Sequence, residues 1–324
     1  MSVREQSTSP SVVAVDIGGT KTAAALVDAS GQISHRIQRP TPAAQGAAAI
    51  LDAAAALVRE VVGAAGSVAA VGVGSAGAFD EDGAVTHATD HLAGWRGTPV
   101  AAGLVARLGI PVVVVNDVHA AALGELALDS DRDRFLFVAV GTGIGGAVVS
   151  EGTLLRGASG MAGSIGHLRA ATMRGRVCSC GGRDHIEAFA SGPGIERSFT
   201  ERTGSVVPLR EVARRAREGD RVAADVIAAA ADELGASLAP VIATVDPGTV
   251  LLGGGVSELG AALVEPLTEG LRACLRPPFA EVRIEIARAG TDAALRGAAW
   301  LAAQTRAAIA ERTASSSRPS ALLS

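Results

Sequence analysis

The densest group of potential ligands lies in one short stretch of the chain. His167, Cys178, Cys180 and His185 follow the pattern H-x10-C-x-C-x4-H, although the whole chain contains only three cysteines and six histidines. Two thiolates and two imidazoles form a tetrahedral donor set for Zn²⁺, and four protein ligands make a closed, structural site. The spacing favours zinc over its main alternative, a redox-active cysteine pair. Glu187 follows closely, so a zinc-stabilised loop would hold its carboxylate in a fixed place.

A second candidate group is the pair Asn116-Asp117, which directly follows the apolar run Pro111–Val115. Open α/β sheets bind ligands at the carboxyl ends of their strands, where this pair falls. A carboxylate there can accept the proton of an alcohol, and the neighbouring amide can bind another hydroxyl. The alternative is that Asp117 only caps the helix that follows. Both interpretations stay open at this point.

Four glycine clusters could bring backbone N–H groups close to a ligand: VAVDIGGTKT (13–22), VGTGIGGAVV (140–149), LLGGGVSELG (251–260) and VGVGSAG (71–77). The first two place a tight turn between two strands, and neither is a Walker A loop or a GxGxxG turn that opens a helix. Their duplication, with Asp16 before the first, favours phosphate binding over the alternative that glycine only permits positive φ in a hairpin. The third cluster is expected to open a helix beside a nucleoside or an α-phosphate.

An alternating series of strands and helices must position these groups. Apolar runs predict strands at Val12–Ile17, Thr22–Val27, Ile33–Gln38, Val68–Val73, Pro111–Val115, Phe135–Val140, Ala147–Ser150, Val250–Leu252 and Val282–Ala287. Helices are expected at Ala43–Val62, Val100–Leu108, 118–128, Asp220–Val245, from Ser257 onward, and Ala293–Ala310. The pattern of strand, glycine turn and strand occurs twice, which predicts two α/β domains with a central cleft.

The domain limits follow from this pattern. We expect an N-terminal domain over 12–117 and a C-terminal domain over 118–292, without a linker between them. The ends at 1–11 and 312–324 are polar and rich in serine, and are expected to be disordered.

Composition narrows the class of protein. Hydrophobic residues make up 48% of the chain, and a net charge of −4 argues against a nucleic-acid or membrane-surface partner. The most apolar stretch, Val226–Val245, is interrupted by Asp232, Glu233 and Pro240. With no signal-like segment at the N-terminus, the sequence predicts a cytoplasmic protein.

Taken together, five motifs resemble the ROK family of sugar kinases and sugar-sensing repressors. They are DIGGTKTAAALVD, NDVHAAALGE, VAVGTGIGGAVVSEGTLLRGASGMAGSIGH, CSCGGRDHIEAFASGPG and LLGGGVSELG. The resemblance implies an actin/hexokinase-like (ribonuclease H-like) fold in which two α/β domains close over ATP and sugar. It also implies that the last helix, 293–311, returns to the N-terminal domain, and that the chain forms a homodimer or homotetramer.

The resemblance further implies roles for individual residues. The ATP phosphates would be held by Asp16, Gly18, Gly19, Thr20, Lys21, Gly141, Thr142 and Gly143. Gly253, Gly254 and Gly255 would lie by the nucleoside. Asp117 would be the general base toward the 6-hydroxyl of the sugar, which Asn116, Glu187, His167 and Gly77 would contact. Mg²⁺ would accompany ATP, and Zn²⁺ would be structural, with His167 also a zinc ligand.

Several positions depart from the family pattern. Ser164 replaces the usual glutamate of the EIGH segment, which removes one carboxylate contact to the sugar. Some N-acylmannosamine kinases also lack that glutamate, so the resemblance leans toward N-acetylmannosamine, with glucose next. His185 replaces the usual third cysteine, Ser75-Ala76-Gly77 lacks the usual proline, and His91 stands where an asparagine is frequent.

Three other functional classes compete with a kinase. A repressor would carry a helix-turn-helix domain of roughly 60–80 residues before the first glycine turn, where only fifteen residues precede Asp16. A catalytically weak or silent sugar sensor without a DNA-binding domain stays as the alternative, since Ser164 weakens the sugar site. An NAD-dependent oxidoreductase would need a glycine turn that opens a helix, and this chain resumes a strand there.

Overall fold

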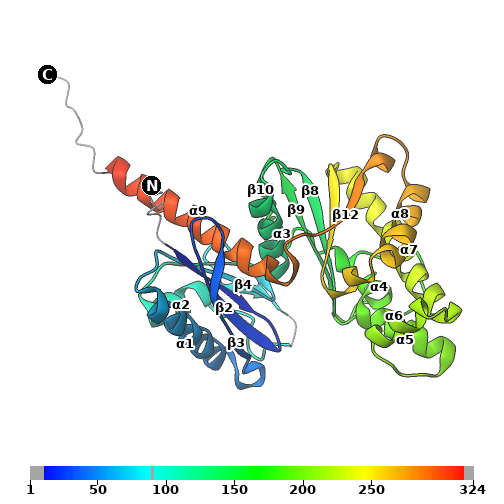
Figure 1. Cartoon of the computed structure of the whole chain (residues 1–324), viewed down its shortest axis with the longest axis horizontal. Coiled ribbons are helices and arrows are strands. Elements are labelled where there is room, and N and C mark those ends of the chain that lie inside the picture. Colours follow the sequence, from blue (N-terminus) through cyan, green and yellow to red (C-terminus); the bar gives the residue numbers. More distant parts are fainter. Residues whose placement is uncertain (1–10, 89–90, 317–324) are drawn as a thin grey trace, which may run out of the picture. The chain divides into compact units, whose positions relative to one another are not determined.

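The computed structural model describes residues 11–88 and 91–316, and the chain divides into two compact units. Unit 1 runs to Asp129 and resumes at Asp292, and unit 2 covers Ser130–Thr291. Each unit is described by itself (Figure 1).

Unit 1 is built on a five-stranded mixed sheet with the order β3-β2-β1-β4-β7. Its strands are β1 (Val12–Ile17), β2 (Lys21–Val27), β3 (Ile33–Pro40), β4 (Val71–Ser75) and β7 (Val112–Asn116), with a small hairpin of β5 (Ala78–Phe79) and β6 (Val85–His87). The first three strands form an antiparallel meander, and β4 and β7 pair in parallel with β1 and with each other.

Helices cover both faces of this sheet. They are α1 (Ala47–Ala65), α2 (Val100–Leu108), α3 (Asp117–Leu128) and α9 (Ala293–Ser316). Alternation along β1 directs Val13, Val15 and Ile17 to the core shared with α1, and Val12 and Ala14 to the core shared with α9. Asp16 continues the second set, so its side chain belongs to the face that carries α9 and α3.

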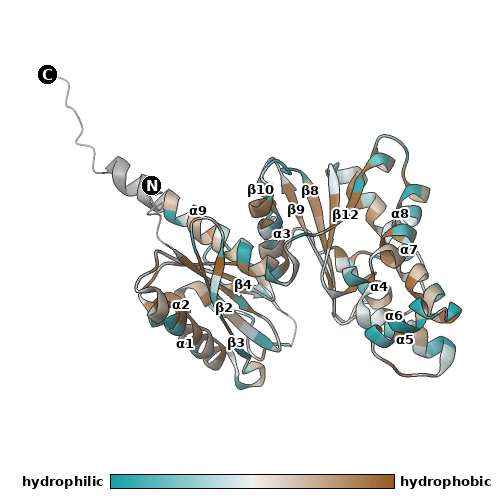
Figure 2. Cartoon of the chain, viewed as in Figure 1, coloured by the Kyte–Doolittle hydropathy of each residue, from teal (hydrophilic) through white to brown (hydrophobic). Residues whose placement is uncertain are grey.

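Unit 2 repeats the same sheet with the order β10-β9-β8-β11-β12. Its strands are β8 (Phe135–Val140), β9 (Ile144–Ser150), β10 (Thr153–Leu154), β11 (Thr249–Gly253) and β12 (Arg283–Ile286). Again three strands form a meander and two pair in parallel with the first. Hydrophobic residues concentrate in β8 and β9 (Figure 2). The duplication read from the sequence is thus a duplication of topology.

The helices of unit 2 are α4 (Glu187–Ala190), α5 (Gly192–Thr203), α6 (Leu209–Arg217), α7 (Arg221–Val245) and α8 (Ala261–Cys274). By length and composition α7 could cross a membrane, but 61% of its most apolar 18-residue window is buried. It packs against α5, α6 and α8, as the core helix of an α/β unit does.

Four expectations need correction. The helix expected from Ser257 begins at Ala261, after a 3-10 turn over Gly255–Leu259. Helices α5 and α6 were not predicted, because α5 opens with Gly-Pro-Gly, which is typical of a loop. The tail predicted to be disordered from residue 312 is helical to Ser316, and residues 1–10 and 317–324 lie outside the described residues.

The fourth correction concerns the division of the chain, which falls after α3 and not before it. The reason is close packing between α3 and α9. A Cβ at Gly297 would lie 1.7 Å from the carbonyl oxygen of Ala120, and one at Gly124 would lie 2.2 Å from that of Ala293. Glycine at both positions lets the helix backbones touch, so α3 belongs with the helix that returns to unit 1.

Candidate functional site

Two carboxylates of unit 1 share one face at the carboxyl edge of its sheet. Asp16 is in register with Gly74 of the neighbouring strand β4, and a Cβ at Gly74 would lie 3.8 Å from the Cα of Asp117. Glycine in the middle strand permits this close approach, since the added Cβ would also lie 3.0 Å from the Cβ of Ala120. Burial and the charge of Asp117 raise the pKa of Asp16 to about 6, against the opposing charges of Lys21 and Arg36. Burial likewise raises the pKa of Asp117.

The cap of helix α3 is Asn116. Its Oδ1 accepts hydrogen bonds from the backbone N–H groups of Val118 (2.9 Å) and His119 (3.1 Å). Asp117 is the first helical residue, and its Oδ1 accepts a hydrogen bond from the Val118 N–H at 2.9 Å. The interpretation that Asp117 serves only as the cap is therefore wrong, because Asn116 is the residue that caps the helix.

The amide of Asn116 also holds the segment Ser75–Gly77. Its Nδ2 donates to the carbonyl of Gly77 at 2.9 Å, and Nε1 of Trp95 donates to the carbonyl of Ala76 at 3.1 Å. Gly77 has φ +110°, and a Cβ there would lie 2.9 Å from the carbonyl oxygen of His87, so this position requires glycine. The Asn116 side chain also hydrogen-bonds the Asp117 carboxylate, which opposes the rise in the pKa of Asp117 that burial causes.

The first glycine turn, Gly18–Lys21, joins β1 to β2. The Gly18 N–H donates to the carbonyl of Lys21 at 3.0 Å, and the Thr41 hydroxyl donates to the carbonyl of Gly18 at 2.8 Å. Gly18 and Gly19 do not have positive φ, so hairpin geometry does not explain them. A Cβ at Gly18 would press on the carbonyl of Lys21 at 3.1 Å, and one at Gly19 would lie 3.5 Å from the Cβ of His91. Thr20 and Lys21 are exposed at the tip.

The second glycine turn, Gly141–Gly143, joins β8 to β9 and is tied to Glu187. The Ile144 N–H donates to Oε2 of Glu187 at 2.9 Å, and a Cβ at Gly143 would lie 2.7 Å from that same oxygen. A side chain at position 143 would therefore displace the Glu187 carboxylate from its place beside the turn. Gly141 faces open space, and Thr142 is exposed. Neither Gly141 nor Gly143 has positive φ.

The third cluster is largely explained by packing. A Cβ at Gly253 would lie 2.6 Å from the Phe137 ring, and one at Gly254, which has φ +82°, would lie 2.4 Å from the Val140 carbonyl oxygen. Gly255 is exposed and faces open space. Because α8 begins only at Ala261, these glycines do not form the N-terminus of an α-helix, contrary to the expectation from the sequence.

The four predicted metal ligands come together in unit 2. Their ligand atoms all lie within 4.8 Å of one another: His167, Cys178, Cys180 and His185. Two antiparallel bridges close the loop, Arg169 with His185 and Val177 with Arg183. Cys178 Sγ lies 4.0 Å from His167 Nδ1, and Cys180 Sγ lies 3.2 Å from His185 Nδ1.

This geometry fits zinc. Bond lengths of about 2.3 Å to sulfur and 2.0 Å to nitrogen place tetrahedral ligands about 3.5 Å apart. Glycine at position 182 leaves room for the His185 ring, since a Cβ there would lie 2.4 Å from Cε1 of His185. Burial raises the pKa of the Cys178 thiol to about 11, with a contribution from the charge of Glu187. A bound cation reverses this preference by stabilising the thiolate.

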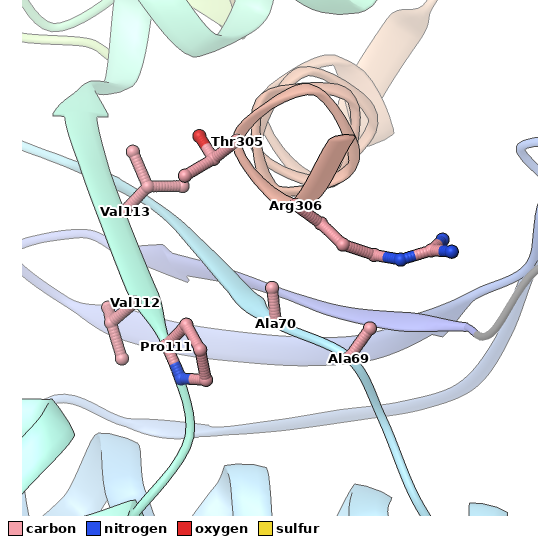
Figure 3. A pocket seen from close by; sticks show the side chains of 7 residues that line it. All are labelled: Ala69, Ala70, Pro111, Val112, Val113, Thr305 and Arg306. Carbon is pink, nitrogen blue, oxygen red and sulfur yellow. The ribbon is translucent and has the colours of Figure 1, made fainter. Parts of the chain in front are cut away.

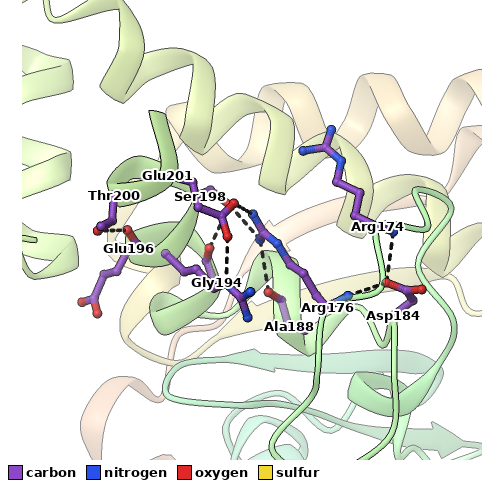
Figure 4. Close-up of polar contacts among 10 residues, drawn as sticks. Arg174, Arg176, Asp184, Ala188, Gly194, Glu196, Ser198, Thr200 and Glu201 are labelled. Atoms are coloured by element: carbon purple, nitrogen blue, oxygen red, sulfur yellow. Dashed lines mark hydrogen bonds and ion pairs between the residues drawn. The ribbon is translucent and has the colours of Figure 1, made fainter. Parts of the chain in front are cut away.

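Residues that the sequence analysis did not single out anchor the metal loop. Asp184 has φ +56°, and its carboxylate accepts hydrogen bonds from the backbone N–H groups of Arg174 (3.1 Å) and Arg176 (3.0 Å). The buried guanidinium of Arg176 donates to the carbonyl of Ala188 and to the Ser198 hydroxyl, and lies 4.8 Å from the centre of the Phe189 ring. Figure 4 shows the hydrogen bonds that link Arg176 to Ala188 of α4 and to Ser198 of α5. In the sequence, the signal for this anchor was Asp184, the aspartate that directly precedes His185.

The loop that carries Ser164 packs on β9 through glycines. A Cβ at Gly163, which has φ +86°, would lie 2.4 Å from the Gly146 carbonyl oxygen, and one at Gly166 would lie 2.0 Å from that of Ile144. The Ser164 hydroxyl donates to the carbonyl of Met161 at 2.7 Å. Ser164 and His167 are both exposed at this end of unit 2.

A pocket elsewhere in unit 1 contains none of the predicted residues. It lies between Ala69–Ala70, residues 111–113, and the α9 side chains Thr305 and Arg306 (Figure 3). Its lining is mostly apolar apart from the side chains of Thr305 and Arg306.

Comparison with known proteins agrees with this geometry. The chain is 38% identical over 295 residues to an N-acetylmannosamine kinase of Shigella flexneri, covering 90% of this chain and 98% of that one. It is 34% identical to a ROK glucokinase from Streptomyces griseus, whose crystal structure contains glucose and AMPPNP. That similarity has a TM-score of 0.76 and covers 91% of this chain and 99% of that one. A ROK hexokinase from Thermus thermophilus is likewise 34% identical, with a TM-score of 0.77 and coverage of 91% and 98%.

These similarities confirm the actin/hexokinase-like α/β fold that the resemblance implied. The ROK family model matches residues 12–305, almost the whole of the described chain. The chain therefore belongs to the ROK family.

Proposed function

We propose that this chain is an ATP-dependent sugar kinase that phosphorylates the 6-hydroxyl of a hexose or an N-acylhexosamine, with N-acetylmannosamine first and glucose second. The observation that carries the proposal is Asp117, a partly buried carboxylate at the carboxyl end of β7 whose pKa is raised while Asn116 caps the helix. The names of relatives at 38% and 34% identity support the same activity.

The base acts in the following way. The carboxylate of Asp117 accepts the proton of the sugar hydroxyl as its oxygen attacks the γ-phosphorus in line with the leaving group. A pKa raised by burial makes that carboxylate a stronger base than an exposed aspartate. The amide of Asn116, which is fixed by two hydrogen bonds to backbone N–H groups, orients a neighbouring sugar hydroxyl.

Phosphate binding is assigned to the two glycine turns. The N–H groups of Gly18 and Gly141 are donated within their own turns, so phosphate binding is assigned to the later N–H groups of each turn and to the ammonium of Lys21. The carboxylate of Asp16 would hold the Mg²⁺ that accompanies ATP, and this cation would neutralise charge at the transferred phosphoryl group. Gly253, Gly254 and Gly255 would lie beside the nucleoside. Of the three, Gly255 has an exposed backbone that faces open space.

Sugar contacts in unit 2 are assigned to Glu187 and His167, and those in unit 1 to Asn116 and Gly77. His167, Cys178, Cys180 and His185 would hold a structural Zn²⁺ that keeps the loop folded. The remaining parts of the proposal are a cytoplasmic enzyme, a small-molecule sugar as partner without nucleic acid or membrane, and a homodimer or homotetramer.

The test is ADP release with Mg-ATP across glucose, mannose, fructose, N-acetylglucosamine and N-acetylmannosamine. We expect turnover on at least one sugar, and Asp117→Asn should lower kcat by about 10²- to 10⁴-fold, because it removes the base and retains the shape. Asp225→Asn, an exposed aspartate of α7, is the matched control and should leave turnover unchanged. Silence of the folded, zinc-loaded protein across the panel would favour the alternative, a sugar sensor without catalysis.

Ser164 is the residue through which we expect the sugar preference to change. Its short side chain leaves room where a glutamate is usual, and this room suits an acylamino group at C2. Ser164→Glu restores a carboxylate for hydroxyl groups, so the ratio of kcat/KM for glucose to that for N-acetylmannosamine should rise. An unchanged ranking across the sugar panel would contradict a role for Ser164 in specificity.

A further inference from the structure

The carboxylate of Glu187 joins two segments of unit 2 that are far apart in the sequence. Its Oε2 accepts the Ile144 N–H at 2.9 Å, at the end of the second glycine turn. Its Oε1 accepts a hydrogen bond from the hydroxyl of Ser179, which stands between the two cysteines of the metal loop. The glycine turn therefore fixes one oxygen of the Glu187 carboxylate, and the metal loop fixes the other.

Ser179 is the donor that remains when the metal loop is loaded. In the structure the Cys178 Sγ also lies 3.5 Å from Oε1 of Glu187, within hydrogen-bonding distance for a thiol. A cysteine that ligates a cation is a thiolate and has no proton to donate. The Ser179 hydroxyl keeps its proton in either state, so it holds Oε1 with or without metal.

From this geometry we propose that Ser179 is a positioning residue that orients the Glu187 carboxylate for sugar binding. The inference rests on the proposed function, in which Glu187 contacts the sugar. Each carboxylate oxygen has a second lone pair, and fixing both oxygens aims these remaining acceptors at the sugar hydroxyls. The metal loop thereby acts on the sugar through the Ser179 hydroxyl, and a bound Zn²⁺ would be held by the four ligand residues alone.

Loss of this hydroxyl should weaken sugar binding selectively. Without Ser179, Oε1 is free to rotate about the remaining bond from Ile144, so orienting it costs part of the binding energy. We expect Ser179→Ala to raise the sugar KM with Mg-ATP, and the sugar Kd measured by calorimetry without nucleotide, by roughly tenfold. The KM for ATP and kcat should stay close to wild type, since Asp117 and the first glycine turn are unchanged.

Two variants separate positioning from a general structural effect. Ser179→Thr retains the hydroxyl and should restore the wild-type KM and Kd for N-acetylmannosamine or glucose, whichever the wild type prefers. Ser205→Ala, a partly buried serine of the same unit outside the loop, should behave as wild type. Zinc content per chain should be the same in all three variants, because none of them removes a ligand.

A double-mutant cycle completes the experiment. If Ser179 acts through Glu187, then Ser179→Ala should cause no further rise in sugar Kd when Glu187→Ala is already present. An equal rise in that background, a fall in zinc content of Ser179→Ala, or a Ser179→Ala protein that matches Ser205→Ala would each overturn the inference alone. A wild type that neither binds nor phosphorylates any sugar of the panel would overturn the proposed function, and the inference with it.

Discussion

Asp16 and Asp117 place two acidic side chains on one face of unit 1, and this arrangement opposes folding. Each carboxylate loses hydration on burial, and for Asp16 the like charge of Asp117 adds to the cost. Lys21 and Arg36 offset part of it at Asp16. A sheet edge without a ligand gains nothing from such a pair, so the acids are expected to reduce stability in exchange for binding and catalysis.

The replacement Asp16→Asn tests this balance. The folded pKa of Asp16, about 6, lies above the ordinary 3.8, so the wild type loses stability as pH rises through this interval and the carboxyl ionises. Asparagine does not ionise. The free energy of unfolding of the variant minus that of the wild type should therefore rise by up to about 3 kcal/mol between pH 4 and 7.

Urea unfolding without nucleotide or divalent cations measures this difference. Asp28→Asn is the opposite control, since the Ser30 hydroxyl and backbone N–H groups lower the pKa of Asp28. That variant should lose stability relative to wild type as pH rises. A difference for Asp16→Asn that does not vary with pH would show that the burial of this charge has no cost.

At single positions, sequence reasoning identified residue types better than their partners. Asn116, Asp117 and Glu187 stand out because polar groups at strand ends and beside a metal pattern are unusual. That Asn116 is the cap, and that Glu187 binds the Ile144 N–H, depends on backbone contacts over long sequence separations. Such contacts leave no periodic pattern in a sequence.

Among the elements, α3 and α9 depend on each other most closely, although they lie at distant points of the chain. Glycines 124 and 297 allow their backbones to approach, and α3 carries Asp117 at its first position. The crossing of these two helices therefore sets where the proposed base stands relative to the sheet.

Gly297→Ala tests the crossing. Its Cβ would lie 1.7 Å from the Ala120 carbonyl oxygen, a backbone atom that cannot rotate away. We expect a loss of about 3 kcal/mol in the free energy of unfolding, at the upper end of ordinary overpacking. Gly63→Ala in α1, where the added Cβ meets open space, should instead stabilise by up to about 1 kcal/mol. Equal stability of the two variants in urea would contradict the tight crossing.

The strength of the apolar pattern explains which elements the sequence predicted. The strands of both meanders and the helices α7 and α9 have strong apolar patterns, and they lie close to their expected positions. The start of α5 is hidden by Gly-Pro-Gly, although Ser191 caps it by accepting a hydrogen bond from the Gly194 N–H. A capping serine followed by proline at the first turn was the signal available there.

For the molecule as a whole, the two units share one sheet topology, and the metal loop is found in unit 2 alone among the described residues. Repetition of strand, glycine turn and strand made the two-unit architecture predictable. The limit after Asp129 was not predictable, because it depends on which unit a helix packs against.

Removal of metal by a chelator should therefore change one unit locally. Two backbone hydrogen bonds lie inside the loop. The Cys178 N–H donates to the carbonyl of Gly182, and the Asp184 N–H donates to the carbonyl of Arg176. Without zinc, residues 171–185 should exchange backbone hydrogens faster, since local opening then needs only these few bonds to break. Peptides from β8, β11 and unit 1 should keep their protection, because their stability comes from separate hydrophobic cores.

Hydrogen exchange with mass spectrometry, with and without EDTA, measures this directly. Cys180→Ser, which removes one ligand, should resemble the chelated protein, and Ser205→Ala should resemble the untreated one. Unchanged exchange over 171–185 after chelation would mean that Asp184 and Arg176 hold the loop unaided. Faster exchange throughout β8 and β11 would mean instead that zinc supports the whole core of unit 2, and that the metal is part of its fold and not of one loop.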